Sequence, residues 1–532
     1  MSVILGNNPF LTIKEIDQLS RCEAKLVLSK EVSFRNRIQK GADFLEDLLR
    51  CNGYIYGVTT GYGDCVTRPV PLELVHELPL HLTRFHGCGL GDILSAPQTR
   101  AVLAVRLASL CRGASGVTVE LLEMLETLIN RDILPIIPSE GSVGASGDLT
   151  PLSYVAAVIV GERDVLYQGE RRPTAEVFKE LGIMPYILRP KEGLALMNGT
   201  SVMTALATEV YCRAEYLVGL SSRLTAMTSL ALRGNPEHFD AFIFSAKPHP
   251  GQAAVAALIR YDLGNSPIRG ERLQDRYSTR CAPHVIGVLA DMLPVFKSII
   301  ETEINSANDN PLIDAEEKRV LHGGNFYGGH IAFVMDSIKT LVANIADLLD
   351  RQLATLVDPK FNHGLPANLS GVEGLRASIN HGLKAVQIGA SAWAAEALKG
   401  TMPASVFSRS TESHNQDKVS MGTIASRDAL RVLQLSEQVA AAHLLATLQG
   451  LRLRERQGVL NSENYSEDLR LFLSKLELMI PFLVEDVPLE DCLRNIIAHI
   501  QRRTWCMYEM NSEGSENSEN SANLNSVNAC RP

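Results

Sequence analysis

The chain has 532 residues, 45% of them hydrophobic, so it can bury a substantial core and form more than one domain. A formal net charge of −9, from 51 basic and 60 acidic residues without a clustered basic run, argues against nucleic acid or an anionic membrane surface as a partner. Ten scattered cysteines without a CxxC pair indicate neither a disulfide framework nor a thiolate zinc site.

The first part of the chain is broken by glycine and proline into short helical patterns, and we expect residues 1–195 to form one irregular domain. Longer helical patterns follow at 200–232, 284–304, 330–356, 375–399 and 424–452. The third shows the four- and three-residue steps of an amphipathic helix at Val334, Ile338, Leu341, Ile345 and Leu348. Alternating strand patterns are few, which predicts a mainly α fold with a long helical bundle over 196–510.

Several long patterns are apolar on more than one face, which indicates that neighbouring subunits cover them. Residues 511–532 are polar and low in complexity, and we expect a disordered tail there. No signal-peptide pattern opens the sequence, and no uncharged apolar run reaches the roughly 18 residues of a membrane span. We therefore expect a soluble cytoplasmic protein acting on a small molecule.

One stretch, GSVGASGDLT at 141–150, predicts unusual chemistry. Such a run can be a simple turn or linker. However, Gly147 follows a serine and has no Cβ to hinder its amide nitrogen, so in a tight bend that nitrogen can attack the Ala145 carbonyl carbon. Loss of water closes a ring, and loss of the Ser146 hydroxyl leaves an exocyclic methylene. The product is an electrophile, which no ordinary side chain supplies.

The longer stretch GSVGASGDLTPLSY resembles the signature of the aromatic amino acid ammonia-lyases, which include the histidine, phenylalanine and tyrosine ammonia-lyases and related aminomutases. The resemblance extends over roughly residues 10–500. It implies a 4-methylidene-imidazole-5-one (MIO) group made from Ala145, Ser146 and Gly147, with no metal. It also implies a fumarase/aspartase-like helical architecture and a homotetramer whose active sites draw on three subunits.

Other segments keep the family order and take their roles from the same resemblance. Tyr56, in YGVTTGYG, corresponds to the catalytic base that removes a β-proton. Arg280, in QDRYSTR, corresponds to the arginine that binds the substrate carboxylate with its two-pronged guanidinium. Tyr277 is expected near the MIO group and the migrating protons. The remaining matches are Gln274, Asn198, Asn310 and Phe326. Taken alone, each also fits an ordinary packed, capping or surface residue.

Two regions bear on the substrate. Gln416, Asn415, Glu412 and Lys384 resemble the phenylalanine and tyrosine branch, because histidine lyases carry glutamate at the position of Gln416 and methionine at that of Lys384. Phe85 matches the aromatic residue of phenylalanine lyases, whereas the next residue, His86, matches histidine lyases. His86 could hydrogen-bond a phenol or catechol, or could be an ordinary core histidine.

These matches together predict deamination of L-phenylalanine or L-tyrosine to cinnamate or p-coumarate. A histidine ammonia-lyase giving urocanate, or an MIO-dependent 2,3-aminomutase, is the alternative. The fumarase and argininosuccinate-lyase superfamily is a weaker rival, because TMPASVFSRS shares only Met402 and Pro403 with its signature loop. A catalytically silent scaffold would require damage to Tyr56, Arg280 or the Ala-Ser-Gly triad, and none is visible.

Overall fold

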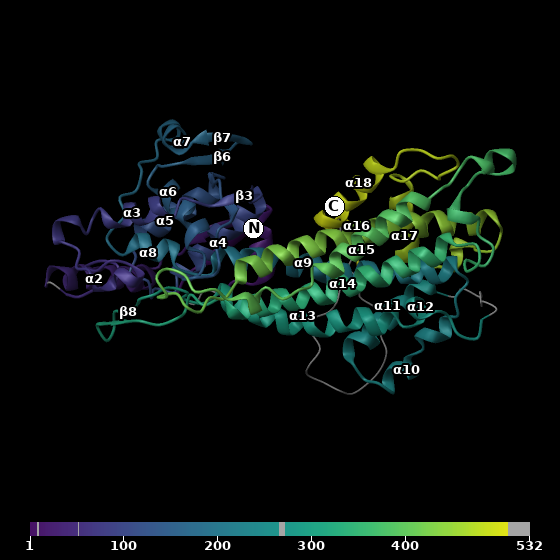
Figure 1. Ribbon diagram of the computed structural model, residues 1–532, viewed down its shortest axis with the longest axis horizontal. Coiled ribbons are helices and arrows are strands. Elements are labelled where there is room, and N and C mark those ends of the chain that lie inside the picture. Colours follow the sequence, from purple (N-terminus) through teal and green to yellow (C-terminus); the bar gives the residue numbers. More distant parts are fainter. Residues whose placement is uncertain (8–9, 52, 265–271, 509–532) are drawn as a thin grey trace. The chain divides into compact units, whose positions relative to one another are not determined.

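The computed structural model describes residues 1–7, 10–51, 53–264 and 272–508, and its described part is mainly helical, as the sequence predicts (Figure 1). Four long helices dominate it: α9 (Ser201–Ala231), α13 (Ala282–Ile304), α14 (Gly329–Val357) and α16 (Gly422–Arg456). Within the described residues, no helix combines the length and the apolar character needed to cross a membrane.

The long helical patterns are confirmed, with one shortened start. The pattern at 375–399 becomes a short 3-10 turn at Gly374–Ser378, and α15 begins only at Lys384. Gly382 breaks the helix: its φ of 51° is left-handed, and an added Cβ would meet the Asn368 carbonyl. Apolar residues in front of this glycine therefore belong to a loop rather than to the helix that follows.

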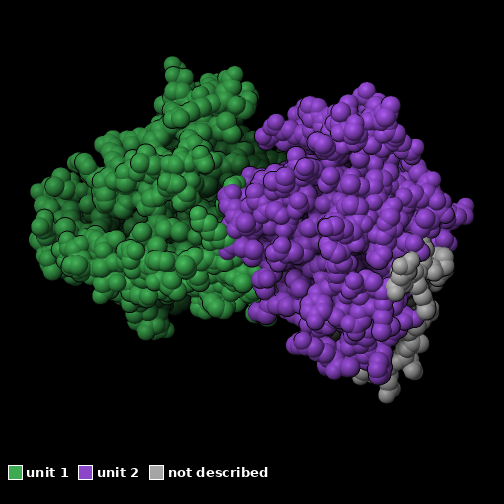
Figure 2. Space-filling model, turned by 45° about the vertical axis from the view of Figure 1, so that its right-hand side comes forward, with its two compact units in different colours: residues 1–212, 293–340, 399–433 green, residues 213–292, 341–398, 434–532 purple. Residues whose placement is uncertain are grey.

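The chain divides into two compact units, drawn in different colours in Figure 2. Unit 1 comprises 1–212, 293–340 and 399–433, and unit 2 comprises 213–292, 341–398 and 434–532. The chain passes from one unit to the other inside each of the four long helices. The boundary at 195/196 stays a prediction, and the predicted tail lies outside the described residues.

Unit 1 contains short helices and small sheets around a buried helix α4 (Ala96–Leu110). Its strands form four separate sheets of two or three strands. Its remaining elements are β1 (Ser2–Leu5), α1 (Ile13–Ser20), β2 (Lys25–Leu28), α2 (Val32–Arg50), α3 (Leu78–Phe85), β3 (Leu90–Ile93), α5 (Val119–Asn130), β4 (Leu134–Pro135), β5 (Pro138–Glu140), α6 (Leu149–Ile159), β6 (Asp164–Tyr167), β7 (Glu170–Pro173), α7 (Thr174–Leu181), α8 (Glu192–Met197), β8 (Leu312–Asp314) and β9 (Arg319–Leu321).

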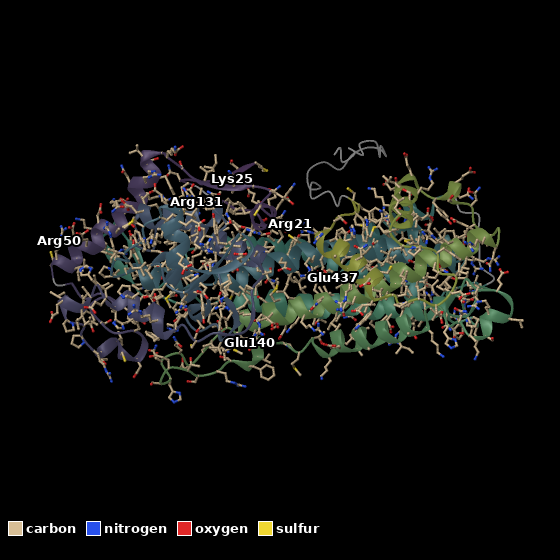
Figure 3. All side chains as sticks on the ribbon, turned by 90° about the horizontal axis from the view of Figure 1, so that it is seen from above. Arg21, Lys25, Arg50, Arg131, Glu140 and Glu437 are labelled. Carbon is tan, nitrogen blue, oxygen red and sulfur yellow. The ribbon has the colours of Figure 1, made fainter. Side chains whose placement is uncertain are left out.

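The strand β5 positions the Gly-rich loop, because it pairs with β3 and ends directly before Gly141. Its last residue, Glu140, is labelled in Figure 3 and accepts a hydrogen bond of 2.6 Å from Arg427 of α16. The loop that follows therefore starts from a strand end held by two other elements of unit 1.

Unit 2 is a helical bundle tied together by buried polar side chains. Gln352 of α14 donates to the hydroxyl of Thr225 in α9, and Thr228 of α9 lies 2.9 Å from the ring of His443 in α16. Ser391 donates to Asp350 and so joins α15 (Lys384–Lys399) to α14. The smaller helices are α10 (Ala241–Ser245), α11 (Pro250–Leu263), α12 (Tyr277–Arg280), α17 (Glu467–Glu477) and α18 (Glu490–Arg502).

Candidate active site

The Gly-rich loop between β5 and α6 is sharply bent. Ser146 and Gly147 have φ angles of 51° and 79°, so two consecutive residues are left-handed. This conformation costs a non-glycine residue roughly 1–2 kcal/mol, so it persists only where the surrounding structure holds the backbone in place. The loop is therefore held bent at Ser146, the residue whose hydroxyl the predicted chemistry removes.

Backbone pairing with Gly199 holds the bend. The Gly199 N–H donates to the Ser146 carbonyl at 3.2 Å, and the Asp148 N–H donates to the Gly199 carbonyl at 2.7 Å. A Cβ added at Gly147 would overlap the Gly199 carbonyl. A glycine is thus required at position 147, where the predicted ring needs an unhindered nitrogen, and the loop fits an MIO group made from Ala145, Ser146 and Gly147.

The Asp148 carboxylate fixes the other end of the loop. It is 0% exposed and accepts from the N–H groups of Val202 (2.9 Å) and Met203 (3.0 Å), which lie in the first turn of α9. It also accepts from the Thr423 hydroxyl. Burial raises the pKa of Asp148 to about 6, although these donors oppose the rise. The carboxylate caps the positive end of a long helix while staying close to titration.

Tyr56 lies on a second loop of unit 1, with its hydroxyl oxygen 2.8 Å from the N–H of Gly63, which donates to it. Its ring meets His322 edge-on at 6.2 Å. Burial raises the pKa of Tyr56, the Gly63 N–H lowers it, and the Glu412 carboxylate raises it. Glu412 in turn accepts from the Asp64 N–H at 2.9 Å, so it holds the Tyr56 loop.

Asn198 precedes the glycine that pairs with the loop. It is 2% exposed, and its amide nitrogen donates to the Asn310 carbonyl at 3.2 Å. Its side-chain oxygen is buried and has no hydrogen-bond partner among the described residues. Buried polar atoms are normally satisfied, so an unpaired acceptor beside the loop is a suitable place for a polar group of a ligand. Asn310 itself accepts from the Gly323 N–H at 2.8 Å.

Gln416 contacts the loop directly. Its amide nitrogen donates to the Ser146 hydroxyl at 3.3 Å, and its carbonyl oxygen accepts from Thr411 at 3.0 Å. Asn415, next to it, is exposed and donates its backbone N–H to the Glu412 carbonyl at 3.0 Å. Phe326 is half-buried in the segment before α14.

Phe85 and His86 lie at the carboxyl end of α3. Their rings are 4.4 Å apart and tilted by 37°, and Phe85 is 59% exposed. Burial lowers the pKa of His86 to about 4, so its imidazole is neutral at pH 7. A neutral imidazole carries one donor and one acceptor nitrogen.

Four predicted residues belong to unit 2. Arg280 of α12 donates from Nε to the Asp275 carbonyl at 3.0 Å and from Nη2 to Gln274 at 3.2 Å, and it lies over the Tyr277 ring at 4.7 Å. Tyr277 is 72% exposed. Lys384 is exposed at the first residue of α15. In unit 1, Gln416 contacts the Ser146 loop and Glu412 contacts the Tyr56 loop. In unit 2, Gln274 and Tyr277 contact Arg280, and Lys384 lies on a different helix.

Sequence reasoning missed several residues that hold the loops. Thr423 and Ser142 both donate to Asp148, and His322 meets Tyr56. Gly63 and Gly199 supply backbone contacts rather than side chains. Ser142, Gly63 and Gly199 stand in or next to sequence runs already singled out for other residues, whereas Thr423 lies outside them.

The mainly helical fold and the sharply bent Ala-Ser-Gly loop are the features of the lyase class that the sequence resembles. Residues 11–475 match the family described as aromatic amino acid lyase, and the chain belongs to that family.

Three similar proteins narrow the comparison. Histidine ammonia-lyase of Geobacillus sp. (strain WCH70) is 37% identical over 490 residues, 91% of this chain and 94% of its own. A crystal structure of tyrosine aminomutase from Streptomyces globisporus has a TM-score of 0.88 and 32% identity, covering 95% of this chain and 98% of its own. Histidine ammonia-lyase from Trypanosoma cruzi has a TM-score of 0.85 and 30% identity, covering 95% and 94%.

These relatives overturn the substrate prediction. Gln416, Asn415, Glu412 and Lys384 predict phenylalanine or tyrosine deamination, but the sequence relative and one of the two solved structures named above are histidine ammonia-lyases. The structure gives a physical reason for the error. Gln416 donates to the Ser146 hydroxyl, and Glu412 accepts from the Asp64 N–H in the loop that carries Tyr56. Lys384 is exposed at the start of a helix. Their identities therefore report how the loops are held rather than which side chain is bound.

Proposed function

We propose that the protein is an MIO-dependent ammonia-lyase that converts L-histidine to urocanate and ammonia. The observation that carries the choice of substrate is His86, a neutral imidazole beside Phe85 at the end of α3. One of its ring nitrogens can donate to, or accept from, a ring nitrogen of a neutral substrate imidazole. The histidine ammonia-lyases among the relatives support the same substrate.

The MIO group would be made by the loop itself. A bond forms between the Gly147 nitrogen and the Ala145 carbonyl carbon, and the Ala145 oxygen leaves as water with the amide protons of Ser146 and Gly147. The Ser146 hydroxyl leaves as a second water with the Ser146 Cα proton. The left-handed bend at Ser146 and the requirement for glycine at position 147 support this chemistry. Once formed, the group supplies an electrophilic methylene that makes the substrate amine a competent leaving group.

Tyr56 would remove the β-proton of the substrate through its phenolic oxygen. The Gly63 N–H donates to that oxygen and favours the phenolate, whereas burial opposes it. The same hydrogen bond orients the oxygen before substrate arrives, which is what a general base requires. Glu412 keeps the loop of Tyr56 in place through the Asp64 N–H.

Arg280 would bind the substrate carboxylate, with Tyr277 and Gln274 beside it. Gln274 and the Asp275 carbonyl already hold the guanidinium, so it is oriented before binding. Asn198, with its unpaired buried oxygen, and Asn310 would hold the amino group and the cofactor. We assign Phe85, His86 and Phe326 to the side-chain pocket, with Asn415 as a further contact. Gln416 would hold the Ser146 loop next to this pocket.

A substrate panel tests the proposal. Purified protein is given L-histidine, L-phenylalanine and L-tyrosine separately, and urocanate, cinnamate and coumarate are followed by ultraviolet absorbance. We expect urocanate as the main product. A dominant cinnamate or coumarate signal, or no product from histidine by protein whose MIO absorbance is present, would refute the assignment.

Replacement of His86 makes the test specific. His86→Leu removes the imidazole contact and should raise KM for histidine about tenfold, the cost of one lost hydrogen bond, with the MIO absorbance retained. An unchanged KM would exclude His86 from the pocket.

An aminomutase is the second candidate, favoured by the likeness to tyrosine aminomutase. Mass spectrometry of the same reactions would then detect a β-amino acid that accumulates alongside the unsaturated acid.

We further propose a homotetramer, because the family's active sites draw on several subunits. Light scattering of the protein as it elutes from a size-exclusion column measures its mass directly. An active monomer would contradict the proposed homotetramer.

A further inference from the structure

Arg106 is a fully buried charged residue of unit 1. It lies in α4 and is 0% exposed. Its Nη2 donates to the Ala195 carbonyl of α8, and a Cβ added at Gly199 would overlap its Nη1. The guanidinium therefore lies directly against the 195–199 backbone, the same segment that pairs with the Gly-rich loop.

Two buried carboxylates surround this guanidinium. Burial lowers the pKa of Arg106 to about 10, while Asp309 and Asp148 raise it, so the residue stays charged at neutral pH. Asp309 also pairs with Lys191 at 2.6 Å, and both of these residues are at most 3% exposed. Asp148 caps α9 and belongs to the loop. The charge of Arg106 therefore interacts with the carboxylate that belongs to the loop.

Burying a guanidinium is unfavourable unless all its donors are paired. In Arg106, Nε and Nη1 have no acceptor among the described residues. A methionine of similar size would fill the same space at lower cost. Packing alone therefore does not explain why a guanidinium, rather than an apolar side chain, occupies this position.

The contacts run from Arg106 to the reacting atoms in two steps. The guanidinium supports Ala195 and Gly199, and Gly199 exchanges backbone hydrogen bonds with Ser146 and Asp148. The Asn308 carbonyl lies on the same side of Gly199 as the guanidinium, and Asn308 accepts a hydrogen bond from Ser109, one turn after Arg106 in α4. One face of α4 therefore holds the Gly199 segment from behind.

We infer that Arg106 is a positioning residue for the self-processing of the loop: it clamps the 195–199 backbone so that Ser146 and Gly147 stay bent while the ring closes. This inference rests on the proposed function, because it presumes that the loop makes an MIO group. It assigns Arg106 no contact with substrate. Its effect is on how fast, and in what fraction of chains, the two waters are lost.

The test compares three variants by intact mass and near-ultraviolet absorbance of folded, purified protein. Arg106→Met removes charge and fork, and Arg106→Lys keeps the charge alone. Arg454→Met is the matched control: Arg454 is also buried, its pKa is also lowered to about 10, and it donates to backbone carbonyls within unit 2. Circular dichroism confirms that each variant is folded.

We expect the processed fraction of Arg106→Met, measured at a fixed time after synthesis, to fall at least about tenfold, as for loss of a charge-assisted hydrogen bond. Arg106→Lys should process at an intermediate rate. Arg454→Met should unfold at lower temperature yet be processed like the unchanged protein. Intact mass reports processing without any substrate, so loss of stability alone does not imitate the result.

Complete processing of folded Arg106→Met at the normal rate would overturn the inference. If Arg106→Met does not fold, Arg106→Lys decides, because a normal processing rate there would overturn it equally. If the protein without any substitution never loses two waters, the cofactor proposal itself is refuted. A processed chain that does not act on histidine refutes only the proposed substrate and leaves the role of Arg106 intact.

Discussion

The Gly-rich loop of unit 1 and the Arg280 segment of unit 2 are organised in opposite ways. The loop is held by distant parts of the chain: Gly199, Thr423 and Gln416 all contact it. The Arg280 segment is held by its own neighbours, since Arg280 bonds to Asp275 and Gln274. Chemistry that the chain performs on itself needs a buried frame, whereas a group that meets a small molecule needs access to solvent.

Removal of the Ser146 hydroxyl changes the Gly-rich loop, leaves the Arg280 segment as it is, and should have the largest effect. Ser146→Ala cannot lose the second water, so we expect no near-ultraviolet MIO absorbance and a loss of activity of at least about 10³-fold. Histidine turnover and absorbance are measured on the same sample. Residual activity near normal would show that the loop is not the electrophile.

Arg280→Lys tests the second region with the first left intact. The charge remains but the fork is lost, so KM for histidine should rise about 10- to 100-fold, or about 1.4–2.8 kcal/mol. Intact mass should show normal processing. Reduced processing with a normal KM would show that Arg280 acts on ring formation in the loop and not on binding of the substrate carboxylate.

Thr423→Val weakens the frame of the loop. Thr423 donates to the Asp148 carboxylate, and loss of a hydrogen bond to a charged group costs about 1.5–3 kcal/mol of unfolding free energy. Urea denaturation gives this value. The control is Thr208→Val, in which the lost hydroxyl bonds only to a helix carbonyl.

The pH dependence of this variant follows from the raised pKa of Asp148. Stability from that raised pKa is complete below the unfolded pKa of about 3.9 and is lost as pH rises through about 6. Thr423 lowers the pKa of Asp148, so its removal raises that pKa further. The stability gap between Thr423→Val and the unchanged protein should therefore widen from about pH 5 to about pH 8. A gap that narrows would contradict the assignment.

The smallest expected change concerns Glu412. Its carboxylate raises the pKa of Tyr56, so Glu412→Gln should lower that pKa and move the rise of kcat/KM with pH toward lower pH. Glutamine keeps an acceptor for the Asp64 N–H. Glu140→Gln, at an ion pair with Arg427, should leave the profile in place. A shift in the opposite direction would mean that Glu412 acts on another group.

Helix periodicity and the signature made much of the fold predictable. The predicted helix at 330–356 agrees with α14 within one residue at each end, because a long amphipathic pattern averages over local exceptions. The start of α15 was missed, because the left-handed Gly382 outweighs the apolar residues before it. Backbone conformation at one residue leaves little trace in composition.

The sequence suggests candidate site residues, but it does not predict the contacts that they make in the structure. Gln416 was taken as a substrate marker, and the structure shows it donating to Ser146. Thr423 gave no signal at all, since a hydroxyl in a helical pattern looks the same wherever it points. Contacts between segments hundreds of residues apart depend on the packing of α9 and α16, which one sequence does not encode in any local pattern.

The carboxylate of Asp148 has a consequence for the order of events during synthesis. It binds the first turn of α9, so the loop takes its bent form only after that helix exists. The proposed electrophile would then form only after folding. Growing or misfolded chains would not carry a reactive carbon able to modify the amines and thiols of neighbouring proteins.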